Sequence, residues 1–307
     1  MGPESGELSE IVDGVYAYVQ PDGTWWVNNA GVVAGDGGVL IVDTCATAER
    51  TSRFLGLAAA ATGVDVPRWA VNTHQHGDHS YGNSLLPEST VLIGHRAMRA
   101  ALATDPMIDQ CPPAWSPVPD WGAVSRRLPD VVIDAGLTLY SGDRRIELHH
   151  PGYPAHTPGD VIVWLPAEKV LFTGDLVFNG LTPLVAMGSA EGGIRALDWL
   201  RSFGAEYVVP GHGPLLPGAD VPDVFGKLES YYRLVLETAE SGRREGLSPL
   251  EAARKRDLGE FAEWADSERL VLNLHREYAL ATGGEVGLMA ALRDAIEFNG
   301  GPLRTTV

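Results

Sequence analysis

Residues 72–79, Asn-Thr-His-Gln-His-Gly-Asp-His, constrain this chain more than any other stretch. They follow the apolar run Trp69–Val71, which is typical of a strand. The residues of a type that binds metal are His74, His76, Asp78 and His79. Because side chains two positions apart at a strand end lie on one face, the first two histidines can offer their imidazoles to one cation. The aspartate and the last histidine turn with the loop and can serve a second cation, so the stretch predicts a metal site.

The ligand types in this stretch favour zinc, with manganese or iron as poorer candidates, because imidazole is a borderline-soft ligand and carboxylate a hard one. A lone His-x-His would be weak evidence for any metal. Four ligand-type residues within six positions, directly after a predicted strand, are much stronger evidence.

The length and composition indicate a folded enzyme. The chain has 307 residues, of which 45% are hydrophobic, and this is enough for a sizeable core in one large domain or two small ones. Its formal net charge of −17 disfavours attraction to nucleic-acid phosphates. We therefore expect no nucleic-acid partner.

The sequence also favours a cytoplasmic location. The two cysteines, Cys45 and Cys111, are too few for a disulfide framework and lie outside any C-x-x-C spacing. Residues 1–10 are acidic and lack the apolar segment of a secretory signal. No run of eighteen apolar residues occurs, so we expect no membrane span.

Strands and helices alternate through the first two thirds of the chain. We expect strands at residues 12–19, 28–34, 39–43, 69–72, 91–93, 131–133, 137–140, 145–149, 161–165 and 170–172. We expect helices at residues 47–61, 96–103 and 192–203. The order strand, helix, strand implies crossover units in an α/β fold. We predict a catalytic domain at residues 1–220 and a C-terminal helical extension at residues 221–307 packed on it.

Residues 104–129 interrupt this pattern with a segment rich in both proline and apolar side chains. Because proline-rich linkers are usually polar, the segment predicts a tethered lid rather than a spacer. Trp25 and Trp26 stand beside an early turn, where they are either core or a flap over a pocket. We predict that six side chains converge over the metals as a hydrophobic mouth: Trp25, Trp26, Met107, Ile108, Trp115 and Trp121.

Three further ligand-type residues follow predicted strands in segments that contain glycine. They are His156 in His-Thr-Pro-Gly-Asp, Asp175 in Thr-Gly-Asp at the end of a short buried strand, and His212 in Pro-Gly-His-Gly. Loops at one edge of an α/β sheet commonly assemble a site. We expect these residues to meet residues 72–79 at such an edge.

These motifs, in this order, resemble those of the metallo-β-lactamase superfamily. Asp43, at the end of Leu-Ile-Val-Asp, matches that family's early structural aspartate. The resemblance covers residues 10–216 and implies an αββα sandwich, in which two mixed sheets lie back to back with helices outside.

By this resemblance, seven side chains bind two Zn²⁺ ions. His74, His76 and His156 would hold the first ion, Asp78, His79 and His212 the second, and Asp175 would bridge them. Such a pair activates water for hydrolysis of a carbonyl substrate, and Asp78 or Asp175 can relay the proton as a catalytic carboxylate.

Two branches of this family fit the residues poorly. True β-lactamases resemble this chain in the histidines but lack the bridging aspartate after Thr-Gly, so Asp175 argues against antibiotic hydrolysis. Flavodiiron proteins have a carboxylate where His76 stands, which weighs against a redox di-iron site. Glyoxalase II-like thioesterases and lactone hydrolases keep the same seven ligands.

Residues 178–188 and 267–278 look similar to an actinobacterial subgroup that includes cyclase/thioesterases of aromatic polyketides. This likeness implies a thioester or ester of a bulky hydrophobic or aromatic acyl group, with cyclisation by aldol closure as a second reaction. Two alternatives stay open: a lactonase or glyoxalase II-like hydrolase of a free small molecule, and a non-catalytic metal-binding module.

An acyl carrier protein is a candidate partner, besides the small-molecule acyl substrate itself. Carrier proteins are acidic, so a chain at −17 should repel one unless positive charge is concentrated near the pocket. Arg126-Arg127 and Arg144-Arg145 offer such charge, or are ordinary solvated turns. A homodimer through the C-terminal helices also stays open.

Overall fold

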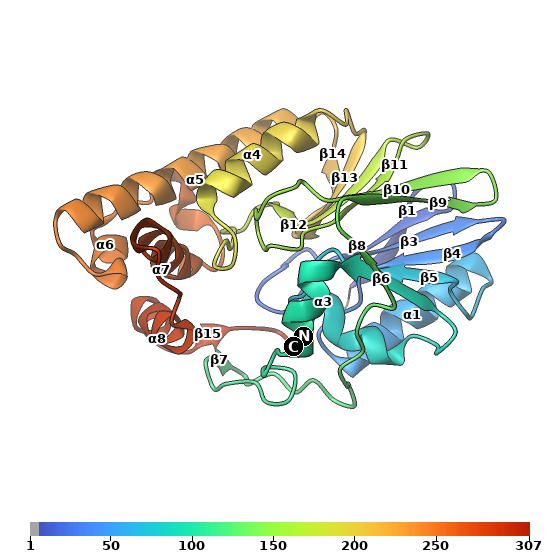
Figure 1. Cartoon of the computed structure of the whole chain (residues 1–307), viewed down its shortest axis with the longest axis horizontal. Coiled ribbons are helices and arrows are strands. Elements are labelled where there is room, and N and C mark those ends of the chain that lie inside the picture. Colours follow the sequence, from blue (N-terminus) through green and yellow to red (C-terminus); the bar gives the residue numbers. More distant parts are fainter. Residues whose placement is uncertain (1–5) are drawn as a thin grey trace.

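The computed structural model describes residues 6–307 (Figure 1). Residues 1–5, part of the segment in which we expect no secretory signal, lie outside the described residues. One sheet has the spatial order β1 (Glu7–Val12), β2 (Val15–Val19), β3 (Ala30–Gly35), β4 (Gly38–Val42), β5 (Trp69–Val71), β6 (Val91–His95) and β8 (Val131–Ile133). The other has the order β14 (Leu216–Pro217), β13 (Tyr207–His212), β12 (Val170–Phe178), β11 (Ile162–Leu165), β10 (Arg144–His149) and β9 (Gly136–Ser141).

The helices of the sandwich lie outside these sheets. They are α1 (Ala48–Thr62), α2 (Gly77–Ser80), the 3-10 turn η1 (Tyr81–Leu85), α3 (Arg96–Ala103) and α4 (Ala190–Arg201). The C-terminal helices are α5 (Val221–Arg244), α6 (Pro249–Lys255), the 3-10 turn η2 (Gly259–Glu263), α7 (Arg269–Thr282) and α8 (Leu288–Asn299). Among residues 6–307, no helix is both long and apolar enough to cross a membrane.

The two sheets pack face to face over a shared hydrophobic core. Leu40 and Val71 of the first sheet and Ile146 and Phe172 of the second belong to one buried cluster. On the outer face of the first sheet, Phe54 of α1 packs in a separate cluster, and α4 and α5 cover the outer face of the second sheet (Figure 1). The predicted αββα architecture with a C-terminal helical region is confirmed.

Local signals in the sequence explain where several helices begin and end. The Thr47 hydroxyl accepts a hydrogen bond from the backbone N–H of Arg50 at the start of α1, and Gly63 ends that helix at φ 70°. Ser248 and Glu251 cap the start of α6 reciprocally.

The strand that carries Asp175 is longer than the sequence predicts. Instead of ending at residue 172, β12 continues to Phe178, and every residue in it is buried. Its pairing with β13 shifts register on either side of Gly174, which adopts φ +51°. The glycine therefore bends the strand without ending it, because the apolar residues beyond still pack.

Residues 104–129 are packed against other parts of the chain, at the C-terminal strand and at the start of α1. Within them, β7 (Trp115–Ser116) pairs in parallel with β15 (Leu303–Arg304) near the C-terminus. The Trp121 indole donates a 2.8 Å hydrogen bond to the carbonyl of Met107 inside the segment. The segment is thus packed on the C-terminal strand and forms a wall, and its movement as a lid stays a prediction.

Candidate metal centre and substrate chamber

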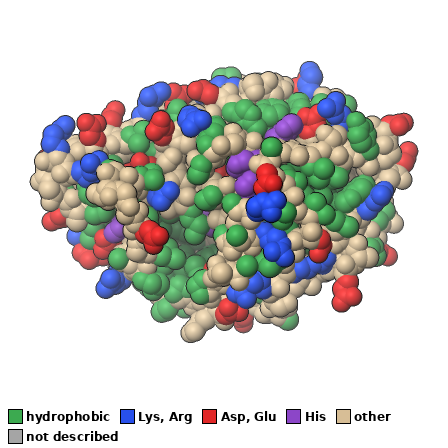
Figure 2. Space-filling view, viewed as in Figure 1, with side chains coloured by type: hydrophobic (Ala, Val, Ile, Leu, Met, Phe, Trp, Pro, Cys, Tyr) green, Lys and Arg blue, Asp and Glu red, His purple; other side chains and the backbone are tan. Residues whose placement is uncertain are grey.

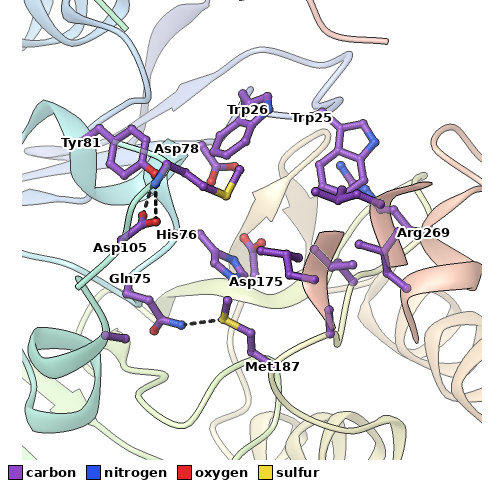
Figure 3. A pocket seen from close by; sticks show the side chains of 18 of the residues that line it. Trp25, Trp26, Gln75, His76, Asp78, Tyr81, Asp105, Asp175, Met187 and Arg269 are labelled. Atoms are coloured by element: carbon purple, nitrogen blue, oxygen red, sulfur yellow. Dashed lines mark hydrogen bonds between the residues drawn. The ribbon is translucent and has the colours of Figure 1, made fainter. Parts of the chain in front are cut away.

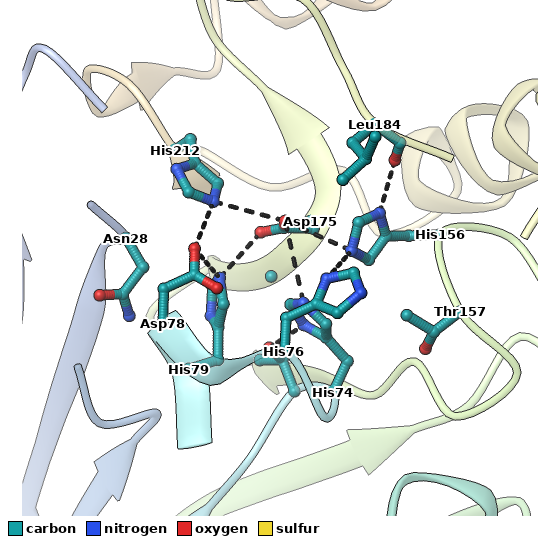
Figure 4. A network of polar contacts seen from close by, with 12 residues as sticks. Asn28, His74, His76, Asp78, His79, His156, Thr157, Asp175, Leu184 and His212 are labelled. Carbon is teal, nitrogen blue, oxygen red and sulfur yellow. Dashed lines mark hydrogen bonds and ion pairs between the residues drawn. The ribbon is translucent and has the colours of Figure 1, made fainter. Parts of the chain in front are cut away.

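Seven side chains from five places in the chain meet at one edge of the sandwich (Figure 4). His74 and His76 follow β5, Asp78 and His79 lie on α2, His156 lies between β10 and β11, Asp175 lies within β12, and His212 ends β13. All seven are buried except His76, which is half-buried. The structure thus brings together every residue that the sequence predicts as a metal ligand.

The first cluster contains three imidazoles and a carboxylate. His76 Nδ1 lies 2.9 Å from His156 Nε2. Asp175 Oδ2 lies 3.4 Å from His156 Nε2 and 3.8 Å from His74 Nε2. These four residues could hold one metal ion.

The second cluster shares the same aspartate. His212 Nε2 lies 3.1 Å from Asp78 Oδ2, and His79 Nε2 lies 3.7 Å from the same oxygen. Asp175 places Oδ1 3.0 Å from His79 Nε2 and Oδ2 3.4 Å from His212 Nε2. Asp175 therefore faces both clusters, as a bridging carboxylate must.

Backbone carbonyls orient one histidine in each cluster. His156 Nδ1 donates a 2.6 Å hydrogen bond to the carbonyl of Leu184, and His212 Nδ1 donates a 2.7 Å bond to that of Gly23. A carbonyl can only accept, so each ring carries a proton on Nδ1 and turns Nε2 toward the cluster.

Asp43 orients the histidines that follow β5. Its Oδ2 accepts hydrogen bonds from His79 Nδ1 at 2.8 Å and from the Thr73 hydroxyl at 2.7 Å. The same hydroxyl lies 3.1 Å from His74 Nδ1, and because it donates to Asp43 it accepts from that ring. Asp43 adopts φ 61°, a conformation rare for a non-glycine residue that is more often retained at functional sites.

Glycines in the two later motifs make room for Asp175. A Cβ on Gly211 would lie 2.0 Å from Asp175 Oδ1, and one on Gly174 would lie 2.5 Å from the Thr73 hydroxyl. Any larger residue at these positions would displace either the carboxylate or the residue that positions His74.

The donor set and its protonation fit a divalent metal. Burial lowers the pKa of His156 to about 3 and lowers the pKa of His74 and His76, so these imidazoles are neutral at neutral pH and can bind a cation. At His212 the Asp175 carboxylate outweighs burial and raises the pKa to about 9, so a cation bound there would displace the proton on Nε2.

Three of the cluster atoms are buried without a hydrogen bond, His74 Nε2, His79 Nε2 and Asp175 Oδ1, although the last two lie 3.0 Å apart as an ion pair. Burying a polar atom without a hydrogen bond is costly, and cations held by the two clusters would satisfy these atoms. The clusters thus form a site suited to divalent metal, with a mixed nitrogen and oxygen donor set of the kind that zinc accepts.

A cavity of about 370 Å³, which we call the chamber, opens onto these clusters (Figure 3). It is lined by Trp25, Trp26, Gln75, His76, Gly77, Asp78, Tyr81, Ala101, residues 104–107, Trp115, Asp175, Phe178, Leu184, Ala186, Met187, His212, Arg269, Leu272, Leu288 and Leu292. In Figure 2, hydrophobic side chains surround a hollow between the C-terminal helices and the sandwich.

Four of the six predicted mouth residues line the chamber: Trp25, Trp26, Met107 and Trp115. Ile108 and Trp121 do not, although both are buried. Trp121 packs edge-on behind Trp26, with ring centroids 4.7 Å apart, and also contacts Tyr81. These two residues support the wall from behind, because consecutive or nearby apolar side chains in a loop cannot all face one cavity.

The sequence reasoning missed the wall that comes from the C-terminal helices. Leu272 and Arg269 of α7 and Leu288 and Leu292 of α8 line the chamber. Arg269 is almost fully buried, pairs with Asp266 at 2.8 Å and lies over the Trp25 ring at 4.5 Å. Helical spacing predicts that such residues are buried, but it does not distinguish a core from a cavity wall.

Three of the four arginines in the two pairs, Arg126, Arg127 and Arg144, bind backbone carbonyls of their own fold, whereas Arg145 pairs with Glu147. Arg127 donates to the carbonyls of Leu86 and Thr90, both at 2.7 Å, and Arg126 donates to that of Asp105 at 2.6 Å. In the other pair, Arg144 pairs with Glu168 at 2.7 Å. These contacts differ from those of solvated turns and leave Arg145, which is about half exposed, as the member most open to solvent.

Comparisons with known proteins agree with this geometry. Acyl-coenzyme A thioesterase MBLAC2 of Bos taurus is 30% identical over 161 residues, 48% of this chain and 56% of that protein. A hydroxyacylglutathione hydrolase of Anaeromyxobacter dehalogenans is 27% identical over 223 residues, 69% of each chain. The chain thus spans between about half and two thirds of the length of these relatives.

Solved structures share the fold. The sec-alkylsulfatase Pisa1 of Pseudomonas sp. superposes with a TM-score of 0.71 at 18% identity, covering 96% of this chain and 55% of that one. The family model described as the metallo-beta-lactamase superfamily matches residues 23–212, which include Asp43 and all seven clustered side chains. The chain belongs to the metallo-β-lactamase superfamily.

Proposed function

We propose that this protein is a binuclear zinc hydrolase that cleaves a thioester or ester carrying a bulky hydrophobic or aromatic acyl group. The observation that carries the proposal is the position of the two metal clusters at one end of a chamber walled by tryptophan, methionine and leucine side chains. Aromatic and aliphatic walls favour an apolar ligand through the surface they remove from water.

Two bound zinc ions would supply Lewis acidity and an activated water. The residues of the chain position the reaction around them. Asp175 would hold both clusters in register, and Asp78, at the chamber end of α2, is placed to accept the proton from the attacking water. The aromatic wall would hold the acyl group beside the clusters and exclude bulk water.

Two polar side chains of the chamber, Tyr81 and Arg269, are already engaged and do not offer a proton to a leaving group, which leaves the relayed proton of Asp78 as the source. Tyr81 donates its hydroxyl proton to Asp105 in a 2.6 Å hydrogen bond, and burial raises its pKa, so this proton is held. Arg269 is paired with Asp266. A thiolate, with an ordinary pKa near 8.5, leaves readily without a proton, whereas an alkoxide does not. This favours a thioester over a simple ester.

The relatives support the same chemistry. One is named as a thioesterase and another as a hydrolase of hydroxyacylglutathione. A cyclase/thioesterase acting on an aromatic polyketide, with or without a carrier protein, is the finer form of this proposal. The apolar chamber supports an aromatic acyl group, and analysis of cyclised against linear products would identify the cyclase reaction.

A glyoxalase II-like or lactone hydrolase acting on a free small molecule is the second candidate. The match to a hydroxyacylglutathione hydrolase over 69% of the chain favours it. It predicts that a small polar acyl group is cleaved at least as well as a bulky one, which an apolar chamber does not favour.

The test is a substrate panel with zinc-loaded protein. Phenylacetyl and acetyl thioesters of one small thiol, the phenylacetyl oxoester and a simple lactone would be compared by kcat/KM. We expect the phenylacetyl thioester to be cleaved best. Preference for the acetyl thioester or the lactone would favour the second candidate. Failure to cleave any of the four, in protein that binds two metals, would support a non-catalytic metal-binding module.

A further inference from the structure

One face of α7 makes hydrogen bonds to the backbone of residues 182–190, the segment between β12 and α4. The four side chains are Arg269, Asn273, Arg276 and Glu277, at positions that lie on the same side of a helix. The bonds are Arg269 Nη1 to Thr182 O (3.0 Å), Asn273 Nδ2 to Pro183 O (2.9 Å), Val185 N to Asn273 Oδ1 (2.8 Å), Arg276 Nε to Gly188 O (2.7 Å) and Ala190 N to Glu277 Oε1 (2.8 Å).

Asn273 occupies the centre of this face and is fully buried. Its amide both donates and accepts, and the two backbone groups that it binds belong to Pro183 and Val185. They flank Leu184, whose carbonyl accepts the 2.6 Å hydrogen bond from His156 Nδ1. The Val185 N–H and the Leu184 carbonyl belong to one peptide group, so Asn273 fixes the plane of the carbonyl that orients this histidine and also the peptide plane before it.

The orientation of His156 depends on that carbonyl. With Nδ1 bonded to Leu184, the ring turns Nε2 toward Asp175 and His76 (Figure 4). A displaced carbonyl would release the ring to rotate or to change tautomer, and a metal ligand would be lost. A buried asparagine that uses both ends of its amide makes such displacement costly, because any movement leaves polar groups unpaired.

The hydrogen bonds of Asn273 do not reach the groups that orient the second cluster. The orienting partner of His212 is the carbonyl of Gly23, and that of His79 is Asp43. Neither partner lies in residues 182–190. An effect transmitted through Leu184 should consequently weaken one metal and spare the other.

We propose that Asn273 is a positioning residue for the first metal. It acts through the Leu184 carbonyl on His156, so that the C-terminal helical extension sets the affinity of the His74, His76 and His156 cluster. This inference rests on the proposed metal centre but not on the identity of the substrate.

The test measures metal affinity in Asn273→Leu, which keeps a similar side-chain size and removes both hydrogen bonds to residues 183 and 185, together with the 3.4 Å bond from the amide to the Tyr231 hydroxyl. Zinc stoichiometry would be measured by elemental analysis, and Co²⁺ titration would be followed by visible absorption. We expect one of the two ions to bind about 10- to 100-fold more weakly, the range found for residues that orient metal ligands, and the other to keep its affinity and spectrum.

A matched control lies on the same helix. His275 pairs with Asp294 of α8 at 2.8 Å and does not touch residues 182–190. His275→Asn should disturb the packing of α7 against α8 and leave both metal affinities unchanged. Should Asn273→Leu fail to fold, Asn273→Ala, which removes the same hydrogen bonds without adding a branched side chain or a charge, replaces it with the same expected selectivity.

A double mutant distinguishes action through His156 from a general loosening. His156→Ala removes a first-cluster ligand, so adding Asn273→Leu to it should not weaken the remaining ion any further. Three results would overturn the inference. The double variant could bind the remaining ion more weakly than His156→Ala does, or Asn273→Leu alone could weaken both ions equally or leave both affinities unchanged. If the wild-type protein bound no divalent metal, the proposed metal centre itself would be overturned. This result differs from the three above, so failure of the metal centre can be told from failure of the role of Asn273.

Discussion

Leu303 and Thr305 hold two tryptophans of the chamber wall in place, so changing them should lower activity on bulky acyl substrates. Leu303 in β15 is fully buried, and its backbone N–H donates a 2.8 Å hydrogen bond to the carbonyl of Ala114, next to Trp115. The Thr305 hydroxyl donates a 2.6 Å bond to the carbonyl of Trp25. The double variant Leu303→Ala with Thr305→Val should therefore loosen both tryptophans without touching a metal ligand.

The cost can be worked from these contacts. Truncating a buried leucine costs about 2–5 kcal/mol, and losing the threonine hydrogen bond about 0.5–1.5 kcal/mol. The sum, roughly 2.5–6.5 kcal/mol, lies below most of the range of domain stabilities, about 5–15 kcal/mol, so we expect a folded protein with a displaced wall. Losing about 100 Å² of aromatic contact with the acyl group would cost about 2.5 kcal/mol, or roughly 50- to 100-fold in kcat/KM.

The assay compares phenylacetyl and acetyl thioesters of the same thiol. The variant should lose most of its kcat/KM on the phenylacetyl substrate and little on the acetyl substrate, with zinc content unchanged. Arg304→Ala is the control, because this side chain is exposed on the same short strand. Equal losses on both thioesters at full zinc content would refute the idea that this wall selects the acyl group.

The other predictions concern the metals, a buried charge and the arginines. His156→Ala and Asp78→Ala should each remove one zinc and most of the activity, and a chelator should abolish activity while the far-UV circular dichroism stays folded, because the scaffold has a large core of its own. Burial raises the pKa of Glu268 above its ordinary 4.5, so folding disfavours the anion and stability falls as pH rises through the raised pKa. Glu268→Gln, which still accepts from the Trp25 indole, should consequently gain melting temperature over the wild type more at pH ~8 than at pH ~4, and a constant difference would contradict this. Arg127→Ala should lower stability by about 1–3 kcal/mol and reduce activity on carrier-bound and free thioesters equally, whereas a loss confined to the carrier-bound thioester would indicate docking.

The fold and the ligand set could be predicted because both depend on local or strongly patterned signals. A metal cluster requires particular residue types at fixed places relative to strand ends, so the motifs around His74, His156 and His212 can be recognised in the sequence. Strand periodicity and helix caps located most elements within a few residues. The strand around Asp175 was predicted too short because a glycine in a buried strand looks the same in sequence as one in a turn.

The contacts between distant segments could not be predicted. The pairing of β7 with β15 joins residues about 190 positions apart, and two-residue strands carry no recognisable pattern. For the same reason the contact of segment 104–129 with β15 could not be predicted, although the sequence indicates a lid there. The roles of Arg126 and Arg127 also depend on which carbonyls lie nearby, and adjacent basic residues indicate only charge.

The metal ligands could be predicted from the sequence and the chamber wall only in part, because the two place different demands on the side chains. The match to the family model ends at residue 212, where the last metal ligand stands, while α7 and α8 continue the chamber wall beyond it. Metal ligation tolerates few residue types, whereas an apolar wall needs only complementary shape, which many side chains supply. Substrate choice can therefore change through the C-terminal helices while the chemistry is retained. Because α7 lines the chamber through Leu272 and also holds residues 182–190 through Asn273, changes in this helix should alter substrate selection and metal affinity together.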